Sequence, residues 1–165
     1  MSTEAAHKSW WQIGEVIFGI PCLVAIALQW LVPFSFPGGL LAPARPLAGA
    51  VLIILGMVLI MLARREFALH NQPTDPGHAT TNLVISGVFS VSRNPIYLGA
   101  TGFLCGIALA FDLPWVMVLL LPALAACHFV LIAPEERYLE ARFGEKYRTY
   151  SANVHRWIGR SRQVG

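Results

Sequence analysis

Residues Ser90–Gly99, with the sequence SVSRNPIYLG, lead into a long apolar run. They place Arg93, Asn94 and Pro95 at the entrance to that run, and proline favours the first turn of a helix. One interpretation is purely structural, with Arg93 reaching the membrane interface and Tyr97 joining an aromatic belt. The other is that these polar residues form one wall of a binding site. The surrounding sequence bears on this choice.

The composition predicts an all-α, multi-pass membrane protein. Of the 165 residues, 56% are hydrophobic and 13% are charged, whereas about 25% of the residues in soluble domains are charged. The apolar residues gather in four blocks, near residues 12–34, 46–63, 96–111 and 113–133. We therefore predict one domain over residues 1–165, with about four transmembrane helices and a cytoplasmic tail over 134–165.

The basic residues predict the orientation, because Lys and Arg are retained on the cytoplasmic side of a membrane. The connections after the first and third blocks hold one of the twelve basic residues, Arg45. The N-terminus, the loop after the second block and the tail hold the others. Both termini are therefore expected in the cytoplasm. The net charge of +3 needs no nucleic-acid partner, since the basic residues form no continuous stripe.

Two segments that flank the last two apolar blocks are expected to be ordered. The loop over residues 70–92 is long, and its apolar residues argue against disorder. Five residues of the tail recur every three or four positions: Leu139, Phe143, Tyr147, Tyr150 and Val154. This spacing predicts one amphipathic face on one or two helices, with Gly144 ending the first. The tail is expected to lie on the membrane surface or to fold over the loop.

Glu135 and Glu136 follow the fourth block and have two interpretations. Acidic residues stabilise a helix N-terminus, and Arg137 or Arg142 would neutralise them. Adjacent carboxylates beside a bilayer are nevertheless costly unless they meet a cation, an arginine or a hydroxyl-rich ligand. A cationic cofactor with a ribose diol would suit them.

The remaining polar residues give weaker signals. His128 lies within the fourth block, and a hydrogen bond to a neighbouring helix is its simplest interpretation. His70 and His78 lie in the loop, where either would reach a substrate. No set of His, Cys and carboxylate residues has metal-ligand spacing, so no metal is expected. The glycine-rich fingerprint of soluble nucleotide-binding folds is absent.

Small residues in the apolar blocks are interpreted as packing residues. Gly102 and Gly106 form a small-xxx-small pattern that predicts close helix packing. The three cysteines all lie within apolar blocks: Cys22, Cys105 and Cys127.

Two segments together resemble a known family. They are LVISGVFSVSRNPIYLG at residues 83–99 and PEERYLEARFGEKYRTYSANVHRWIG at residues 134–159, separated by an apolar span pair. The order of G-x-F/Y, R-[HN]-P-x-Y-x-G and E-E-x-x-L-x-x-x-F-G-x-x-Y-x-x-Y resembles the isoprenylcysteine carboxyl methyltransferase and phospholipid methyltransferase group of membrane enzymes. The resemblance runs from Thr74 onward, and the first two blocks match only as hydrophobic segments.

This resemblance implies an S-adenosylmethionine-dependent methyltransferase that binds its cofactor at the cytoplasmic end of the last spans. The matching cofactor-binding residues are Gly87, Val88, Phe89, Arg93, Asn94, Pro95, Tyr97, Leu98, Glu135 and Glu136. Arg93 and Glu136 are also the expected catalytic residues. The chain departs from the pattern at Asn94, where histidine is commoner, and at Val88-Phe89, where Pro-Tyr is commoner. Asparagine does not titrate near neutral pH, so a histidine base at that position is excluded.

The acceptor is expected to be lipophilic or amphiphilic and to enter from the bilayer. A prenylcysteine carboxylate, a phosphatidylethanolamine amine and a thiol all remain open. The absence of a dedicated base favours an acceptor that is already anionic or easily ionised. Two alternatives to a methyltransferase are a membrane NAD(P)H-dependent reductase of related architecture and a non-catalytic membrane interaction protein. The inner membrane of a bacterium is the expected location.

Overall fold

The computed structural model describes residues 10–39, 42–70 and 82–161, and all of its named elements are helical. They are α1 (Trp10–Leu31), the 3-10 helix η2 (Ala42–Ala44), α2 (Arg45–Leu69), the 3-10 helix η3 (Gly87–Ser90), α3 (Pro95–Ala110), α4 (Pro114–Ala126), the π-helix η4 (Cys127–Ile132), α5 (Ala133–Phe143) and α6 (Glu145–Asn153). The prediction of an all-α fold is confirmed for these residues.

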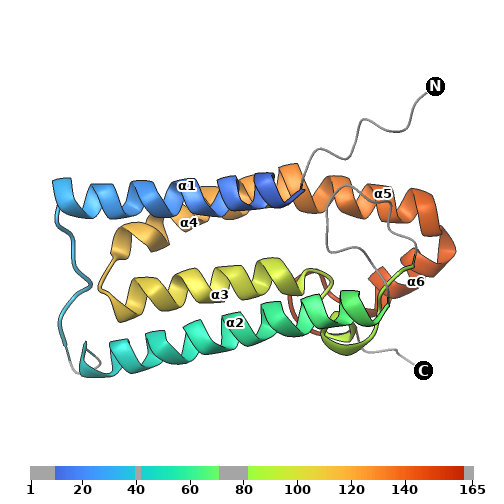
Figure 1. Cartoon of the computed structure of the whole chain (residues 1–165), viewed down its shortest axis with the longest axis horizontal. Helices are drawn as coiled ribbons and strands as arrows, with labels where there is room; N and C mark the ends of the chain where they lie inside the picture. Colours follow the sequence, from blue (N-terminus) through green and yellow to red (C-terminus); the bar gives the residue numbers. More distant parts are fainter. Residues whose placement is uncertain (1–9, 40–41, 71–81, 162–165) are drawn as a thin grey trace.

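The long helices form two pairs that lie side by side (Figure 1). α1 packs along α4, α2 packs along α3, and α3 also contacts α4. Two continuous helices, over residues 42–69 and 114–143, are long and apolar enough to cross a membrane. The apolar helices over residues 16–31 and 95–110 are shorter. The count of four crossings therefore stays a prediction.

Glycines set the close approach of α2 and α3. Gly49 and Gly56 on α2, like Gly99 and Gly106 on α3, are two helical turns apart and share one face. A Cβ atom at Gly106 would lie 2.7 Å from the Gly49 carbonyl oxygen, and one at Gly99 would lie 2.7 Å from the Gly56 carbonyl oxygen. Only glycine fits such backbone contact. The predicted close packing is therefore present at Gly106, whereas Gly102 faces open space and Gly99 makes the second contact.

Asp112 ties the connections together at one end of the molecule. Its carboxylate accepts a hydrogen bond from the Phe36 backbone N–H at 3.0 Å and pairs with Arg45 at 3.3 Å. Trp115 Nε1 donates to the Val32 carbonyl oxygen at 2.9 Å nearby. Asp112, at a φ of 53°, forms the tight turn between α3 and α4. The loop before η3 and helices α5 and α6 lie at the opposite end (Figure 1).

The C-terminal tail packs against Leu83 of the loop that precedes η3. A buried cluster joins Leu83 of the loop to residues of α6 and beyond: Tyr147, Tyr150 and Val154, with Leu139 and Phe143 packed against them. The Tyr150 hydroxyl donates to the Phe89 carbonyl oxygen at 2.7 Å. Gly144, at a φ of 53°, separates α5 from α6. The five residues of the predicted amphipathic face thus lie in one cluster, which Leu83 of the loop joins.

Two helices continue beyond their apolar blocks, because charged residues end the apolar block without ending the helix. α2 continues through Arg64 and Arg65 to Leu69. The fourth helix continues through Pro134 to Phe143. A proline in a regular helix clashes with the carbonyl four residues earlier. Here the wider π-helical turns of η4 lie immediately before Pro134 and change that geometry.

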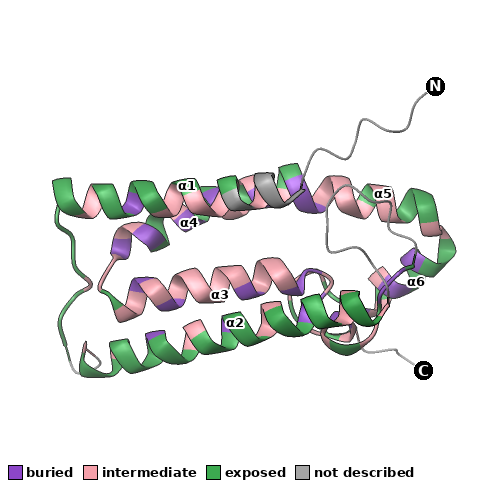
Figure 2. Cartoon of the chain, in the orientation of Figure 1, coloured by how far each residue is buried: buried purple, intermediate pink, exposed green. Residues whose placement is uncertain are grey.

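The outer faces of α1 and α2 expose large apolar side chains (Figure 2). Leu23 on α1 is 68% exposed and Leu47 on α2 is 70% exposed. Contiguous apolar surface of this kind is rare on soluble monomers and is expected where helices contact lipid. This surface agrees with membrane association of the chain.

Candidate functional site

The site lies where three segments meet. They are the residues that precede α3, the first turn of α5, and the turn that follows α6. The Arg93 backbone N–H donates to the His155 carbonyl oxygen at 3.1 Å, and the Gly159 N–H donates to the Val91 carbonyl oxygen at 2.8 Å. Asn94 Nδ2 donates to the Arg156 carbonyl oxygen at 3.2 Å. These hydrogen bonds hold the terminal turn against the segment that opens α3.

Asn94 and Pro95 therefore build the scaffold of the site. Asn94 is 7% exposed, and its backbone N–H donates to the Ser92 hydroxyl at 3.1 Å. Pro95 is fully buried at the start of α3. The asparagine that replaces the commoner histidine thus uses its side-chain amide to fix the tail.

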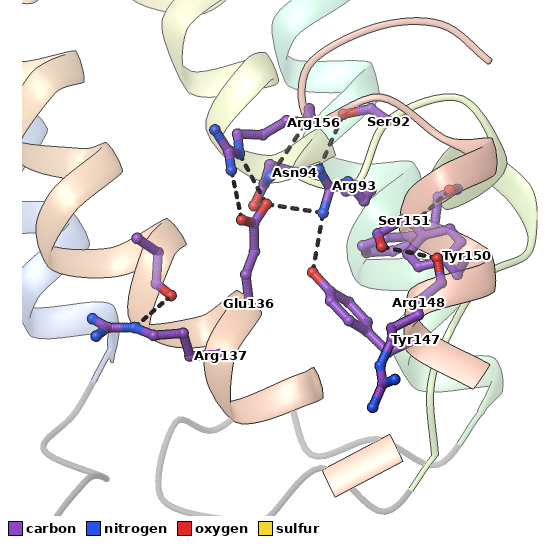
Figure 3. Close-up of polar contacts among 12 residues, drawn as sticks. Ser92, Arg93, Asn94, Glu136, Arg137, Tyr147, Arg148, Tyr150, Ser151 and Arg156 are labelled. Atoms are coloured by element: carbon purple, nitrogen blue, oxygen red, sulfur yellow. Dashed lines mark hydrogen bonds and ion pairs between the residues drawn. The ribbon is translucent and has the colours of Figure 1, made fainter. Parts of the chain in front are cut away.

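Glu136 is the centre of the polar cluster (Figure 3). Arg156 donates to both of its carboxylate oxygens, from Nε at 2.9 Å and from Nη2 at 2.7 Å. Arg93 Nη1 lies 3.0 Å from Glu136 Oε1 and also donates to the Tyr147 hydroxyl at 3.2 Å. The structure thus brings together Arg93 and Glu136, as the sequence predicted. Paired hydrogen bonds from a guanidinium to a carboxylate are among the strongest in proteins.

These contacts decide which form of Glu136 is favoured. Burial raises its pKa, but the hydrogen bond from Arg156 and the charges of Arg93 and Arg156 outweigh burial, so the pKa lies below its ordinary value. The hydrogen bond to Glu136 in turn raises the pKa of Arg156. Glu136 is therefore a fixed anion that holds two cations in place.

Glu135 has a different environment, although it is the adjacent residue. It lies beyond the apolar part of the fourth helix, is partly buried, and has no hydrogen bond or ion pair within the described part of the chain. Burial, and then the charge of Glu136, raise the pKa of Glu135 to about 7. Its charge reaches Tyr97 of α3 and Cys127 of η4. Glu135 is therefore a carboxyl group available to a ligand.

One donor in the site also lacks a partner. Arg93 Nε is buried and has no acceptor among the described residues. Buried donors in folded proteins almost always have a partner, from the protein, water or a ligand. Within the described residues, Arg93 Nε thus lacks an acceptor, and Glu135, the neighbour of Glu136 in the chain, lacks a partner.

The predicted residues of the 3-10 helix lie on another side of the site. Gly87 has a φ of 55°, and the Glu66 side chain occupies the space that a Cβ atom would need. Phe89 packs against Phe67 of α2, with ring centroids 4.9 Å apart. Val88 joins this apolar cluster. The structure thus anchors this turn to α2 and α6, and its role in cofactor binding stays a prediction.

Tyr97 and Leu98 occupy the first turns of α3. Tyr97 packs against the buried cluster of Cys127, Leu131 and Ile132, which places its ring between α3 and the π-helix. Leu98 is partly buried. Tyr97 therefore belongs to the apolar interior beside the π-helix.

A family model, phospholipid methyltransferase, matches residues 44–146, which covers α2 to the start of α6. The chain belongs to this family. The predicted resemblance is confirmed, and the protein is a membrane methyltransferase. No curated protein and no solved structure matches the chain. Arg93, Glu135 and Glu136 lie inside the matched region, whereas Arg156 lies beyond its end.

Two residues of the cluster were missed by the sequence analysis of this phospholipid methyltransferase family member. Arg156 and Tyr147 both contact the Arg93–Glu136 pair. One of the two interpretations of the glutamates had Arg137 and Arg142 as their partners. Arg137 instead donates to the Ala133 carbonyl oxygen, and Arg142 donates to the Tyr138 hydroxyl. The only sequence signal for Arg156 was its place in the quoted tail segment.

The histidines lie around this centre. His128 is partly buried in the π-helix, and its charge acts on Glu136. His70 Nδ1 lies 2.9 Å from the Glu66 carbonyl oxygen, which places His70 at the end of α2. His78 lies outside the described residues. No group of three metal-ligating side chains occurs in the ranges that the structure describes.

Proposed function

We propose that this protein transfers a methyl group from S-adenosylmethionine to a lipophilic or amphiphilic acceptor at the cytoplasmic face of a membrane. The observation that carries the proposal is the ion pair between Arg93 and Glu136, with Glu135 next to Glu136 in the chain, which lies at one end of the helices inside the region matched by the family model. Membership of the family favours methyl transfer over the reductase and docking-protein alternatives.

The free groups of the cluster fit the parts of S-adenosylmethionine. The Glu135 carboxylate would accept hydrogen bonds from ribose hydroxyls or from the amino group, and Arg93 Nε would donate to the cofactor carboxylate. The Tyr97 ring offers an aromatic face to a sulfonium. The other motif residues are proposed to shape this wall of the site: Gly87, Val88, Phe89, Asn94, Pro95 and Leu98.

Glu136 is proposed to act through its partners, because both of its oxygens already accept hydrogen bonds from Arg156. It holds Arg93 and Arg156 in fixed positions. It is therefore a positioning residue in this proposal, in place of the direct catalytic role that the motif predicted.

Methyl transfer from S-adenosylmethionine requires no covalent intermediate with the protein. When bound, S-adenosylmethionine supplies an electrophilic methyl group. The protein's own residues then have to align the acceptor with that group and exclude water. The polar head of the acceptor would lie at the cluster and its apolar part among the helices. Carboxylate, lipid and thiol acceptors all suit this arrangement.

The test is cofactor binding by the purified full-length protein, measured by calorimetry. The protein should bind S-adenosylmethionine and not NADPH. Glu135→Gln and Arg93→Ala should each weaken binding by about tenfold or more, because each removes a hydrogen bond to a charged group. Arg137→Ala is the control, since Arg137 is exposed and bonded to its own helix. Binding of NADPH alone, or of neither cofactor, would refute the proposal.

A second experiment identifies the methyl acceptor once cofactor binding has been measured. Transfer of a labelled methyl group should be measured on phosphatidylethanolamine, on a prenylated cysteine and on small thiols. The class that gains the label identifies the acceptor.

A further inference from the structure

The polar cluster has more hydrogen-bond donors than acceptors. A guanidinium carries five N–H donors. Arg156 uses its Nε and Nη2 on Glu136, and Arg93 uses Nη1 on Glu136 and Tyr147. Arg93 Nε is buried without an acceptor in the described part of the chain. Two guanidiniums thus share one carboxylate and retain donors for another acceptor.

The cluster also has an unbalanced charge. Arg93 and Arg156 are paired with a single carboxylate, that of Glu136, which leaves one positive charge in this ion-paired group. The Arg93 side chain is 14% exposed and that of Glu136 is 18% exposed. A partly buried cation without a counter-ion is costly. A planar oxyanion, such as a carboxylate or a face of a phosphate, matches the fork of a guanidinium.

We propose that Arg156 binds the oxyanion of the methyl acceptor, either a phosphate or a carboxylate, beside the Arg93 Nε–H that is assigned to the cofactor. The identity of the ligand as an acceptor rests on the proposed methyltransferase function. The position of the Arg156 guanidinium is fixed before any ligand binds. The terminal turn is hydrogen-bonded to the segment before α3, and the Glu136 carboxylate accepts a hydrogen bond from Arg156.

Side-chain exposure assigns Arg156 to the acceptor and not to the cofactor. The side chain of Arg156 is 39% exposed, whereas that of Arg93 is 14% exposed, so Arg156 forms the open rim of the cluster. A residue at the rim is suited to distinguish substrates. A thiol without an anionic group would not use this site.

The experiment compares probes that carry an oxyanion with counterparts that lack it, using the full-length protein in a phosphate-free nonionic detergent. Dihexanoyl phosphatidylethanolamine is compared with dihexanoylglycerol, and N-acetyl-farnesylcysteine with its methyl ester. Wild type should bind one anionic probe at least about tenfold more tightly than its counterpart, as expected for a charge-assisted hydrogen bond. The pair that shows the preference identifies a phosphate or a carboxylate.

The decisive variant is Arg156→Gln, which should lose this preference. Arg148→Gln is the matched control, because Arg148 is 61% exposed and pairs with Glu140 and Glu145 instead of the cluster. Arg156→Lys keeps the positive charge and should retain part of the preference. Melting temperatures would show whether each variant is folded.

Separate titration with S-adenosylmethionine distinguishes this inference from the proposed function. Loss of the anion preference in Arg156→Gln with unchanged cofactor affinity would support the inference. A wild-type preference without any cofactor binding would refute the proposed function and leave the anion site standing. The inference is overturned if wild type shows no preference, if a folded Arg156→Gln keeps it, or if that variant loses cofactor affinity to the same extent.

Discussion

Glu136 accepts hydrogen bonds from Arg156 and pairs with Arg93, whereas Glu135 has no such partner within the described residues. Neighbouring side chains on a helix point in different directions, which explains how adjacent carboxylates meet different surroundings. Their pKa values move apart, downward for Glu136 and upward for Glu135. Carboxyl groups whose pKa values are shifted in opposite directions can take different roles in one site.

The raised pKa of Glu135 predicts a pH-dependent stability. The pKa is about 7 in the folded chain against an ordinary value of 4.5. Between these values the folded protein keeps a proton that the unfolded chain releases, so stability falls as the pH rises through this interval and is level above it. Glu135→Gln removes the titrating group. Its melting temperature relative to wild type should therefore increase from about pH 5 to about pH 7 and then stay constant.

Scanning fluorimetry across this pH range would measure the difference. Glu140→Gln is the control, since Glu140 is 53% exposed and paired with Arg148. A Glu135→Gln difference that does not change with pH would contradict the prediction.

The sequence predicted the meeting of Arg93 and Glu136 through the order of two motifs, and the structure joins them. It could not predict Arg156 as their partner. Helical spacing identifies neighbours three or four residues away, whereas Arg156 is separated from Glu136 by α6 and two turns. Only the folded tail brings them together.

Among the helices, α2 and α3 make the closest contact, and glycines at a spacing of seven produce it. Without a hydrophobic driving force in lipid, such pairs rely on packing of small residues. The seam between α2 and α3 is therefore expected to be sensitive to a single added methyl group.

Gly106→Ala and Gly102→Ala form a matched test of this seam. The added Cβ at Gly106 would lie 2.7 Å from backbone atoms of Gly49 and Ile53, whereas the one at Gly102 would meet nothing within 4 Å. Gly106→Ala should destabilise the protein by about 1–3 kcal/mol through overpacking. Gly102→Ala should be neutral or stabilising by up to about 1 kcal/mol, because alanine favours helices. Denaturant unfolding in detergent measures both. Equal effects would argue against the seam.

Composition located the apolar blocks, but it did not predict where two of the helices end. Charged residues such as Arg64 and Glu135 mark where a chain leaves an apolar environment, and a helix continues there at little cost. The π-helix before Pro134 had no sequence signal, since it depends on packing of Cys127 and Ile132 against other helices. The amphipathic tail was predictable because its period of three to four residues is a local property.

The complete bundle has two chemically different ends. One end holds Arg45 and Asp112 with the connections after α1 and α3. The other holds the polar cluster and the terminal helices (Figure 1). Basic residues are retained on the cytoplasmic side, so the polar cluster is expected there.

This orientation is tested with single cysteines, after the three native cysteines are replaced by alanine. Gly38→Cys lies at the first end and Ala152→Cys lies at the second, and both positions are exposed. In intact cells an impermeant maleimide should label Gly38→Cys at once and Ala152→Cys only after permeabilisation. Labelling of both positions from outside would contradict the predicted orientation.

The division of the bundle into two pairs bears on how the site would open. Arg93 extends from the α2/α3 pair, which glycines lock together, and Glu136 extends from the helix that packs along α1. The ion pair between them therefore joins the two helix pairs at this end of the bundle. A relative shift of the two pairs would break it, so a lipid that entered between them would also expose both charges.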